Sequence, residues 1–180
     1  IIAVTGSSGA GTTSVTRSFQ HIFRRDKINA ETIEGDSFHR HDRAEMKARM
    51  LERMAAGDNH FSHFGPEANL LGDLEDLFRE YGETGRGKRR HYIHDADEAK
   101  VYGTEPGKFT AWEELPENTD LLFYEGLHGA VKTDDVDVPR HIDLCVGVVP
   151  IINLEWIQKI HRDKSQRGYS KEAVMDTILR

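Results

Sequence analysis

Short apolar runs along the chain predict four β-strands. Residues 1–5, IIAVT, form an apolar run that ends at a glycine, which is typical of a strand buried on both faces. Similar apolar runs follow at residues 120–124 and 142–149, and residues 30–34 indicate a further short strand. A length of about four to eight residues favours strands over helices.

Longer stretches with helical spacing separate these runs. Residues 12–25 carry apolar side chains three and four positions apart, which predicts an amphipathic helix. We expect a second helix over residues 42–56, where Asp42 is suited to be the N-cap. Further helices are expected over about residues 67–81, over residues 151–166, and from Ser170 onward.

The order of these elements predicts the fold class. A strand, a glycine-rich loop and a helix, followed by further strands and helices, indicate an α/β protein with a mainly parallel sheet and helices on both faces. Residues 82–116 are rich in glycine and charge, which favours a hairpin or arm inserted over a site. We expect residues 1–180 to form a single domain that is incomplete at its C-terminal end. Ligands of such sheets bind at the carboxyl ends of the strands.

Composition argues against several classes of protein. Of the 180 residues, 37% are hydrophobic and 31% are charged. No apolar run reaches about 18 residues and no leader-like segment occurs, so we expect neither a membrane span nor secretion. The net charge of −7 argues against a nucleic-acid partner. The single cysteine, Cys145, lies in an apolar run, so we expect a buried, inert thiol and a reducing, cytoplasmic location.

The chain has ten histidines, and two groups of them could suggest a metal site. These groups are HRH at residues 39–41 and HFSH at residues 60–63. Neither has a cysteine partner or the HExxH spacing, which disfavours a structural zinc site.

The stretch GSSGAGTTS, residues 6–14, follows the first strand. It matches the phosphate-binding pattern G-x-x-x-x-G-K-[ST] at Gly6, Gly11 and Thr13, but Thr12 stands where that pattern has lysine. Glycines let backbone N–H groups converge on an anion, and the helix N-terminus adds partial positive charge. We expect this loop to bind nucleotide phosphates, with a purely structural turn as the alternative. The expected contacts are Gly6, Ser7, Ser8, Gly9, Ala10, Gly11, Thr12, Thr13 and Ser14.

Two carboxylates follow strands of the expected sheet. Glu125 ends the run DLLFYEG and, together with the Thr13 hydroxyl, is suited to hold Mg²⁺. Asp36, in EGDSFHR, is suited to accept a proton from a substrate hydroxyl that attacks the γ-phosphate. The alternatives are a surface turn acid for Glu125 and a helix cap or loop acid for Asp36.

Two groups of cations accompany these acids. The first group lies in residues 159–172, KIHRDKSQRGYSKE, where a lid could supply the charge missing at Thr12. Such charge is needed because phosphoryl transfer depends on charge stabilisation. A solvated helix face is the alternative. The basic residues of this stretch are Lys159, Arg162, Lys164, Arg167 and Lys171. The second group, His39, Arg43 and Arg49, forms a patch suited to a phosphorylated substrate, with a surface helix charge as the alternative for Arg49.

Several stretches together resemble the phosphoribulokinase family. K-I-H-R-D-x-x-x-R-G-x-S-x-E at residues 159–172 looks like its signature. EGDSFHR, FSHFGPEAN, FREYGETGRGKRRHYIHD and FYEGLHGAV look like blocks of its bacterial type, in the family's order. The resemblance implies a P-loop NTPase-like kinase that uses ATP and Mg²⁺ to phosphorylate D-ribulose 5-phosphate on its 1-hydroxyl, for carbon fixation in the Calvin cycle. Bacterial members also tend to lack the loop lysine.

The resemblance also implies roles for individual residues. Asp36 matches the family's catalytic base, Glu125 its metal-side carboxylate and Asp163 a second catalytic acid. Lys159 and Arg162 match residues needed for transfer. The positions assigned to the substrate side are His39, Arg43, Arg167, His94 and His128.

The resemblance extends to regulation. Arg25 matches a position linked to effector binding in bacterial members, which NADH activates and AMP inhibits. We therefore expect an allosteric homo-oligomer. Plant-type members carry a redox-sensitive cysteine in or beside the loop, and this loop has none, so thiol regulation is not expected.

Two other functions stay open. A uridine- or cytidine-kinase-like enzyme would use the same loop and base on a nucleoside, but the cationic patch after Asp36 favours an anionic acceptor. A non-catalytic nucleotide-binding regulatory protein is suggested by Thr12 in the place of lysine. The presence of Asp36, Glu125, Asp163 and Lys159 argues against it, because a binding module needs no general base.

Overall fold

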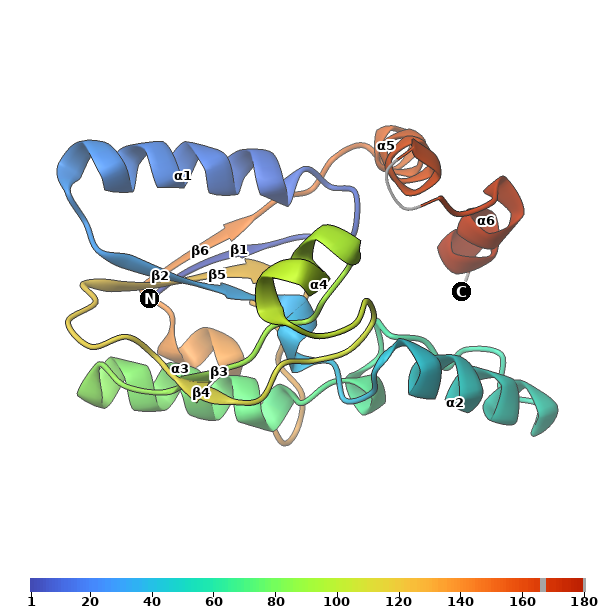
Figure 1. The fold of residues 1–180 in the computed structure, drawn as a ribbon, viewed down its shortest axis with the longest axis horizontal. Coiled ribbons are helices and arrows are strands. Elements are labelled where there is room, and N and C mark those ends of the chain that lie inside the picture. Colours follow the sequence, from blue (N-terminus) through green and yellow to red (C-terminus); the bar gives the residue numbers. More distant parts are fainter. Residues whose placement is uncertain (166–167, 180) are drawn as a thin grey trace.

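A parallel sheet forms the centre of the molecule (Figure 1). The structure is a computed structural model that describes residues 1–165 and 168–179. The strands of this sheet are β1 (Ile2–Thr5), β2 (Ala30–Glu34), β5 (Leu121–Gly126) and β6 (Leu144–Gly147). Their order is β2-β5-β1-β6, and every pairing is parallel. The four expected strands and the mainly parallel sheet are confirmed.

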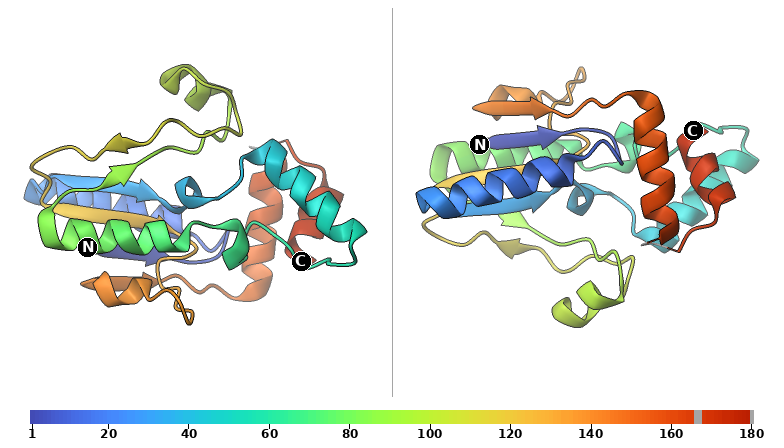
Figure 2. Two further views of the ribbon diagram at one scale, coloured as in Figure 1. Left: turned by 90° about the horizontal axis from the view of Figure 1, so that it is seen from below. Right: turned by 90° about the horizontal axis from the view of Figure 1, so that it is seen from above.

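Helices cover both faces of the sheet, as Figures 1 and 2 show. On one face lies α1 (Thr12–Asp26), where Phe19 and Phe23 pack against Phe123. On the other face lies α3 (Leu71–Thr84), together with the short 3₁₀ helix η3 (Val138–His141).

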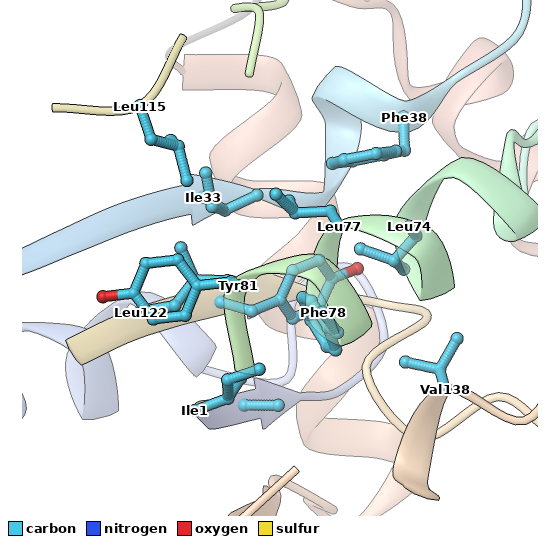
Figure 3. Close-up of a cluster of buried hydrophobic side chains, with 12 residues drawn as sticks. Ile1, Ile33, Phe38, Leu74, Leu77, Phe78, Tyr81, Leu115, Leu122 and Val138 are labelled. Atoms are coloured by element: carbon cyan, nitrogen blue, oxygen red, sulfur yellow. The ribbon is translucent and has the colours of Figure 1, made fainter. Parts of the chain in front are cut away.

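The larger apolar core lies on the α3 side (Figure 3). Leu74 and Phe78 of α3 are fully buried there, and the Phe78 ring packs edge-on against Tyr124 of β5. Since fully burying one such side chain contributes about 1.5–3 kcal/mol, this core and the smaller one under α1 stabilise the central strands. The strand ends that carry the candidate acids are thereby fixed.

Three helices lie beyond the carboxyl ends of the strands: α2 (Arg43–Ala55), α5 (Ile152–Ser165) and α6 (Lys171–Leu179) (Figures 1 and 2). Asp42 caps α2 as predicted, because its carboxylate accepts the N–H groups of Ala44 and Glu45 while Glu45 accepts the N–H of Asp42. Two short 3₁₀ helices, η1 (Gly35–Phe38) and η2 (Pro66–Ala68), complete this end.

Residues 85–116 form an arm beside the sheet, since the expected first three residues of the arm, 82–84, are the end of α3 (Figure 2). Its base is an antiparallel pair, β3 (Lys88–Arg89) and β4 (Glu113–Glu114), which agrees with the expected hairpin. The arm also contains a helix that the sequence analysis missed, α4 (Ala96–Tyr102). Asp95 caps α4 by accepting the N–H groups of Asp97 and Glu98.

The structure corrects three expectations. Cys145 is exposed rather than buried, because β6 is an edge strand whose faces the described helices cover little, so that Leu144 and Gly147 are exposed as well. β6 is also shorter than the expected residues 142–149. The helix expected from about residue 67 begins at Leu71, because Pro66–Ala68 forms a separate 3₁₀ turn. Among the described residues, no helix combines the length and apolar character needed to cross a membrane.

Candidate active site

The glycine-rich loop joins β1 to α1 and lies directly under α5. Gly9 and Gly11 both have φ 101°, in the left-handed region that favours glycine. A Cβ on Gly9 would lie 3.1 Å from the Lys159 Cβ and 3.2 Å from the Glu155 carbonyl oxygen. The loop therefore combines the N-terminus of α1 with close packing against α5, which suits it to an anion and brings α5 side chains to it.

Two cations of α5 reach this loop. The Arg162 guanidinium donates to the Ser8 hydroxyl at 2.9 Å, and the Lys159 ammonium donates to the same oxygen at 3.4 Å. Asp163 accepts from both, at 2.9 Å from Arg162 and 3.2 Å from Lys159. Lys159 and Asp163 are buried. The structure thus brings positive charge to the loop that has Thr12 in place of lysine.

A cavity of about 190 Å³ opens beside the loop. Its lining includes the hydroxyl residues Ser7 and Ser8, the rings of Phe64 and Trp156, and Lys159. Polar groups of the loop and a buried cation therefore border a small, mostly apolar space.

Glu125 lies at the end of β5, next to the start of α1. The hydroxyl of Thr12 donates to its carboxylate, and burial, opposed by this hydrogen bond, raises the pKa of Glu125. Thr13, the next residue of α1, is exposed. A partly buried carboxylate gains from a nearby cation, and a carboxylate with a hydroxyl suits Mg²⁺, which takes its remaining ligands from water and phosphates. No described group of three or more His, Cys, Asp or Glu side chains is placed to hold a metal alone.

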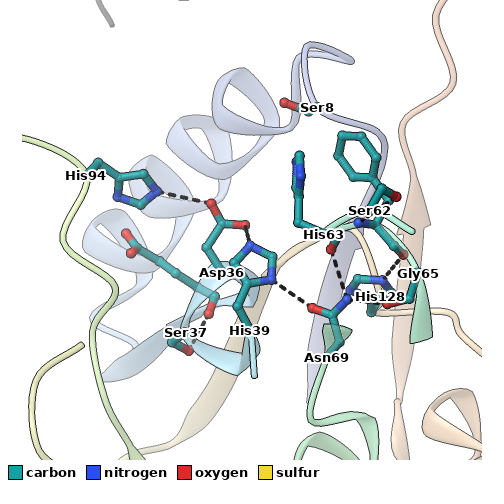
Figure 4. Close-up of polar contacts among 12 residues, drawn as sticks. Ser8, Asp36, Ser37, His39, Ser62, His63, Gly65, Asn69, His94 and His128 are labelled. Atoms are coloured by element: carbon teal, nitrogen blue, oxygen red, sulfur yellow. Dashed lines mark hydrogen bonds and ion pairs between the residues drawn. The ribbon is translucent and has the colours of Figure 1, made fainter. Parts of the chain in front are cut away.

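Asp36 is the second residue of η1, which follows β2 directly, and it lies between two imidazoles (Figure 4). Its carboxylate oxygens lie 3.1 Å from His94 Nε2 and 3.4 Å from His39 Nε2. Burial opposes ionisation, but the hydrogen bonds from His39 and His94 outweigh it and hold the pKa of the Asp36 carboxyl well below its usual range. The side chain remains 48% exposed, so the carboxylate is both ionised and accessible.

Asn69 supports His39 from below and was missed by the sequence analysis. Its Oδ1 lies 2.8 Å from His39 Nδ1, while its amide nitrogen donates to the carbonyls of His63 at 3.0 Å and Gly65 at 2.7 Å (Figure 4). Asn69 is 1% exposed, so these bonds replace water completely. It lies in the FSHFGPEAN stretch, but a contact with a histidine 30 residues away leaves no local sequence signal.

The arm closes one side of the site. Arg90 donates to the carbonyl oxygens of Ser37 at 2.8 Å and His39 at 2.6 Å. Its guanidinium carbon lies 3.7 Å from the centre of the Phe109 ring and 4.7 Å from that of Trp112. The arm therefore holds the backbone of the turn that carries Asp36 and His39, a role that the sequence analysis missed.

We expect Arg90→Met to lower the free energy of unfolding by about 2 kcal/mol, because two charge-assisted hydrogen bonds and the contact with two rings are lost. Urea unfolding of the variant measures this loss. Arg86→Met removes an exposed arginine from the same arm and is the matched control, with a change expected within about 0.5 kcal/mol. Equal stability of the two variants would contradict the anchoring role of Arg90.

The remaining predicted site residues differ in their positions. Arg43 joins the site, because its guanidinium donates to the His94 carbonyl at 2.9 Å. His128 Nε2 lies 3.0 Å from the Phe64 carbonyl oxygen, so its ring supports the segment beside the loop. Arg49 forms an exposed ion pair with Glu52 on α2.

Of the two other predicted residues, one lies far from the glycine-rich loop and one falls outside the residues that the structure describes. Arg25 pairs with Asp26 at the end of α1 far from the loop. Arg167 falls outside the described residues.

Comparisons with known proteins agree with these features. The model of the phosphoribulokinase / uridine kinase family matches residues 1–180. The chain is 66% identical over 180 residues to the chromosomal phosphoribulokinase of Cupriavidus necator and 62% identical to the phosphoribulokinase of Nitrobacter vulgaris. In both cases all of this chain is covered, and it spans about 62% of the length of the curated relative.

Solved structures give the same result. The phosphoribulokinase from Rhodobacter spheroides superposes with a TM-score of 0.85 at 55% identity, covering 99% of this chain and 61% of that one. A putative fructose transport system kinase from Silicibacter sp. TM1040 superposes with a TM-score of 0.68 at 14% identity, covering 99% of this chain and 78% of that one, which shows a shared fold.

Proposed function

Because the chain belongs to the phosphoribulokinase / uridine kinase family, we propose that it transfers the γ-phosphoryl group of ATP to the 1-hydroxyl of D-ribulose 5-phosphate. The product, D-ribulose 1,5-bisphosphate, would serve carbon fixation in the Calvin cycle. The observation that carries the proposal is the ionised, half-exposed Asp36 carboxylate between His39 and His94. It lies at the carboxyl ends of the parallel strands, where the glycine-rich loop also lies.

ATP would bind with its phosphates on residues 6–14. Backbone N–H groups at the start of α1 and the cations Lys159 and Arg162 at Ser8 would compensate the phosphate charge. Thr13 and Glu125 would hold Mg²⁺, which supplies charge neutralisation between the phosphates when it is bound. Asp163 keeps the two cations oriented towards Ser8.

Asp36 would act as the general base. It accepts the proton of the substrate hydroxyl as that oxygen attacks the γ-phosphorus atom, and the oxygen between the β- and γ-phosphorus atoms leaves with ADP. A carboxylate with a low pKa is ionised at neutral pH, and its accessible oxygen can face the hydroxyl. The reaction therefore needs no prior deprotonation of the enzyme.

The substrate phosphate would bind the cationic groups around Asp36. Burial lowers the pKa of His39 and of His94, but the neighbouring Asp36 carboxylate outweighs it and raises both pKa values. Arg43 lies beside His94. These cations favour an anionic sugar phosphate over a neutral nucleoside. We assign Arg49, Arg167 and His128 to the substrate side as well, the last through its support of the 61–65 segment.

We extend the proposal to regulation and location. Arg25 would contribute to an effector site that NADH activates and AMP inhibits, in a cytoplasmic homo-oligomer. Its exposure at the end of α1, apart from the glycine-rich loop, is compatible with a separate site.

The proposal predicts ATP turnover with ribulose 5-phosphate and none above background with uridine. Coupled assays of ATP consumption on this chain and on the full-length protein, with each acceptor in turn, test it. Turnover with uridine alone would replace the proposal by a nucleoside kinase. ATP binding without turnover in the full-length protein would favour a regulatory protein.

A further inference from the structure

The imidazole of His94 lies between two carboxylates. Its Nε2 is 3.1 Å from an oxygen of Asp36, and its Nδ1 is 3.2 Å from Glu98 Oε2 on α4. Ionised carboxylates accept hydrogen bonds and donate none, so both contacts are satisfied only when both ring nitrogens carry a proton. The geometry therefore fits the charged imidazolium of His94.

His39 provides an internal comparison on the other side of Asp36. Its Nε2 also faces the Asp36 carboxylate, but its Nδ1 faces the amide oxygen of Asn69. The orientation of this amide is fixed, because its nitrogen already donates to two carbonyl oxygens. The two histidines thus share one carboxylate and differ in their second partner, which is anionic for His94 and neutral for His39.

We propose that Glu98 is a positioning residue that holds His94 as the charged imidazolium beside Asp36. The carboxylate of Glu98 is itself fixed, since the same Oε2 accepts the backbone N–H of His94 at 2.7 Å. The ring and the backbone of His94 are therefore tied to one oxygen, and the arm delivers a fixed positive charge to the candidate base.

The other titratable and charged groups around His94 act in both directions: Glu34 favours its charged form, the cations His39 and Arg43 oppose it, and the Tyr92 ring packs edge-on against the imidazole at 5.0 Å. Burial lowers the pKa of His94, and Asp36, Glu98 and Glu34, in that order, outweigh this effect and raise it. The groups that face His94 from the packed elements are Asp36, Glu34, Glu98, Glu125, His39 and Arg43, the last through the His94 carbonyl. Of these, Glu98 is the one in direct contact with Nδ1.

The consequence for catalysis rests on the proposed function. A charged His94 favours the ionised form of Asp36 and gives an anionic substrate a cationic partner up to a higher pH than an unassisted imidazole would. Without Glu98, His94 would have the same kinds of partner as His39 and would lose its proton at lower pH.

The Glu98→Gln variant separates this role from helix capping. Glutamine keeps an oxygen that can accept the His94 backbone N–H, so the start of α4 is preserved while the charge is removed. We expect NMR titration of the intact protein to place the pKa of His94 above that of His39 in the wild type. In Glu98→Gln, the pKa of His94 should fall towards that of His39.

Two further variants complete the titration. Asp97→Asn removes an equal charge from the next residue of α4, whose carboxylate pairs with Lys100 and lies outside the His94 contacts, and should leave the pKa of His94 nearly unchanged. Asn69→Asp gives His39 an anionic second partner and should raise its pKa. An equal response of His94 to Glu98→Gln and Asp97→Asn, or no response to either, would overturn the proposal.

A kinetic measurement adds a readout that a structural role would not move. In Glu98→Gln, the alkaline limb of the pH profile of kcat/KM for ribulose 5-phosphate should move to lower pH, with a loss of up to about tenfold in the alkaline range. Below the pKa of His94 the variant should match the wild type. An unmoved limb would overturn the proposal. Absence of turnover at every pH would defeat the proposed function, while the NMR titration would still decide the charge of His94.

Discussion

Asp36→Asn is expected to lower kcat by about 10²- to 10⁴-fold while the KM for ATP stays nearly unchanged. An amide has the same shape as the carboxylate but does not accept the substrate proton. The glycine-rich loop and the cations at Ser8 belong to other elements, so nucleotide binding should persist. Steady-state kinetics with ribulose 5-phosphate and ATP measure both constants.

The control for this prediction is Asp26→Asn. It removes a carboxylate that pairs with Arg25 at the far end of α1 and should leave kcat within about twofold of the wild type. Because asparagine at position 36 also takes a negative charge from between His39 and His94, the pKa of both imidazoles should fall in the same variant. A variant that keeps near-normal kcat would refute the assignment of Asp36 as the base.

Local patterns were sufficient to predict the elements that carry the loop and the acids. The apolar runs that became β1 and β5 lie between helices on both faces, so they lack polar alternation and are recognisable without a structure. The run that became β2 is a weaker signal, because it contains Glu31 and Glu34 and buries only Ile33. The positions of Asp36 and Glu125 followed from the ends of these runs. The N-cap at Asp42 was likewise encoded within four residues of sequence.

Contacts between distant segments account for what the sequence analysis missed. Asn69 and Arg90 act on His39 and the backbone around Asp36 from segments 30 and more than 50 positions away. The exposure of Cys145 depends on which strand lies at the edge of the sheet, and an apolar run does not contain that information. The arm was recognised by its composition, but its helix α4 was overlooked although Asp95 precedes Glu98 by the spacing of a helix cap.

Lys159→Met should reduce kcat by about 10²- to 10³-fold, whereas Thr12→Ala should reduce it by about fivefold. Lys159 is a buried cation at the loop, so its removal takes charge stabilisation from the transferred group. Thr12 gives up one neutral hydroxyl, and Glu125 loses one hydrogen bond. Steady-state kinetics of both variants in the same assay rank the two effects.

Lys164→Met is the matched control for Lys159→Met. Lys164 lies on the exposed side of the same helix, so its loss should change kcat by less than about twofold. Asp163 keeps its ion pair with Arg162 in Lys159→Met, so α5 should stay folded and circular dichroism should report an unchanged fold. If Thr12→Ala proved more damaging than Lys159→Met, the charge absent from the glycine-rich loop would not come from α5, and the loop itself would have to stabilise the phosphates through its backbone and Mg²⁺.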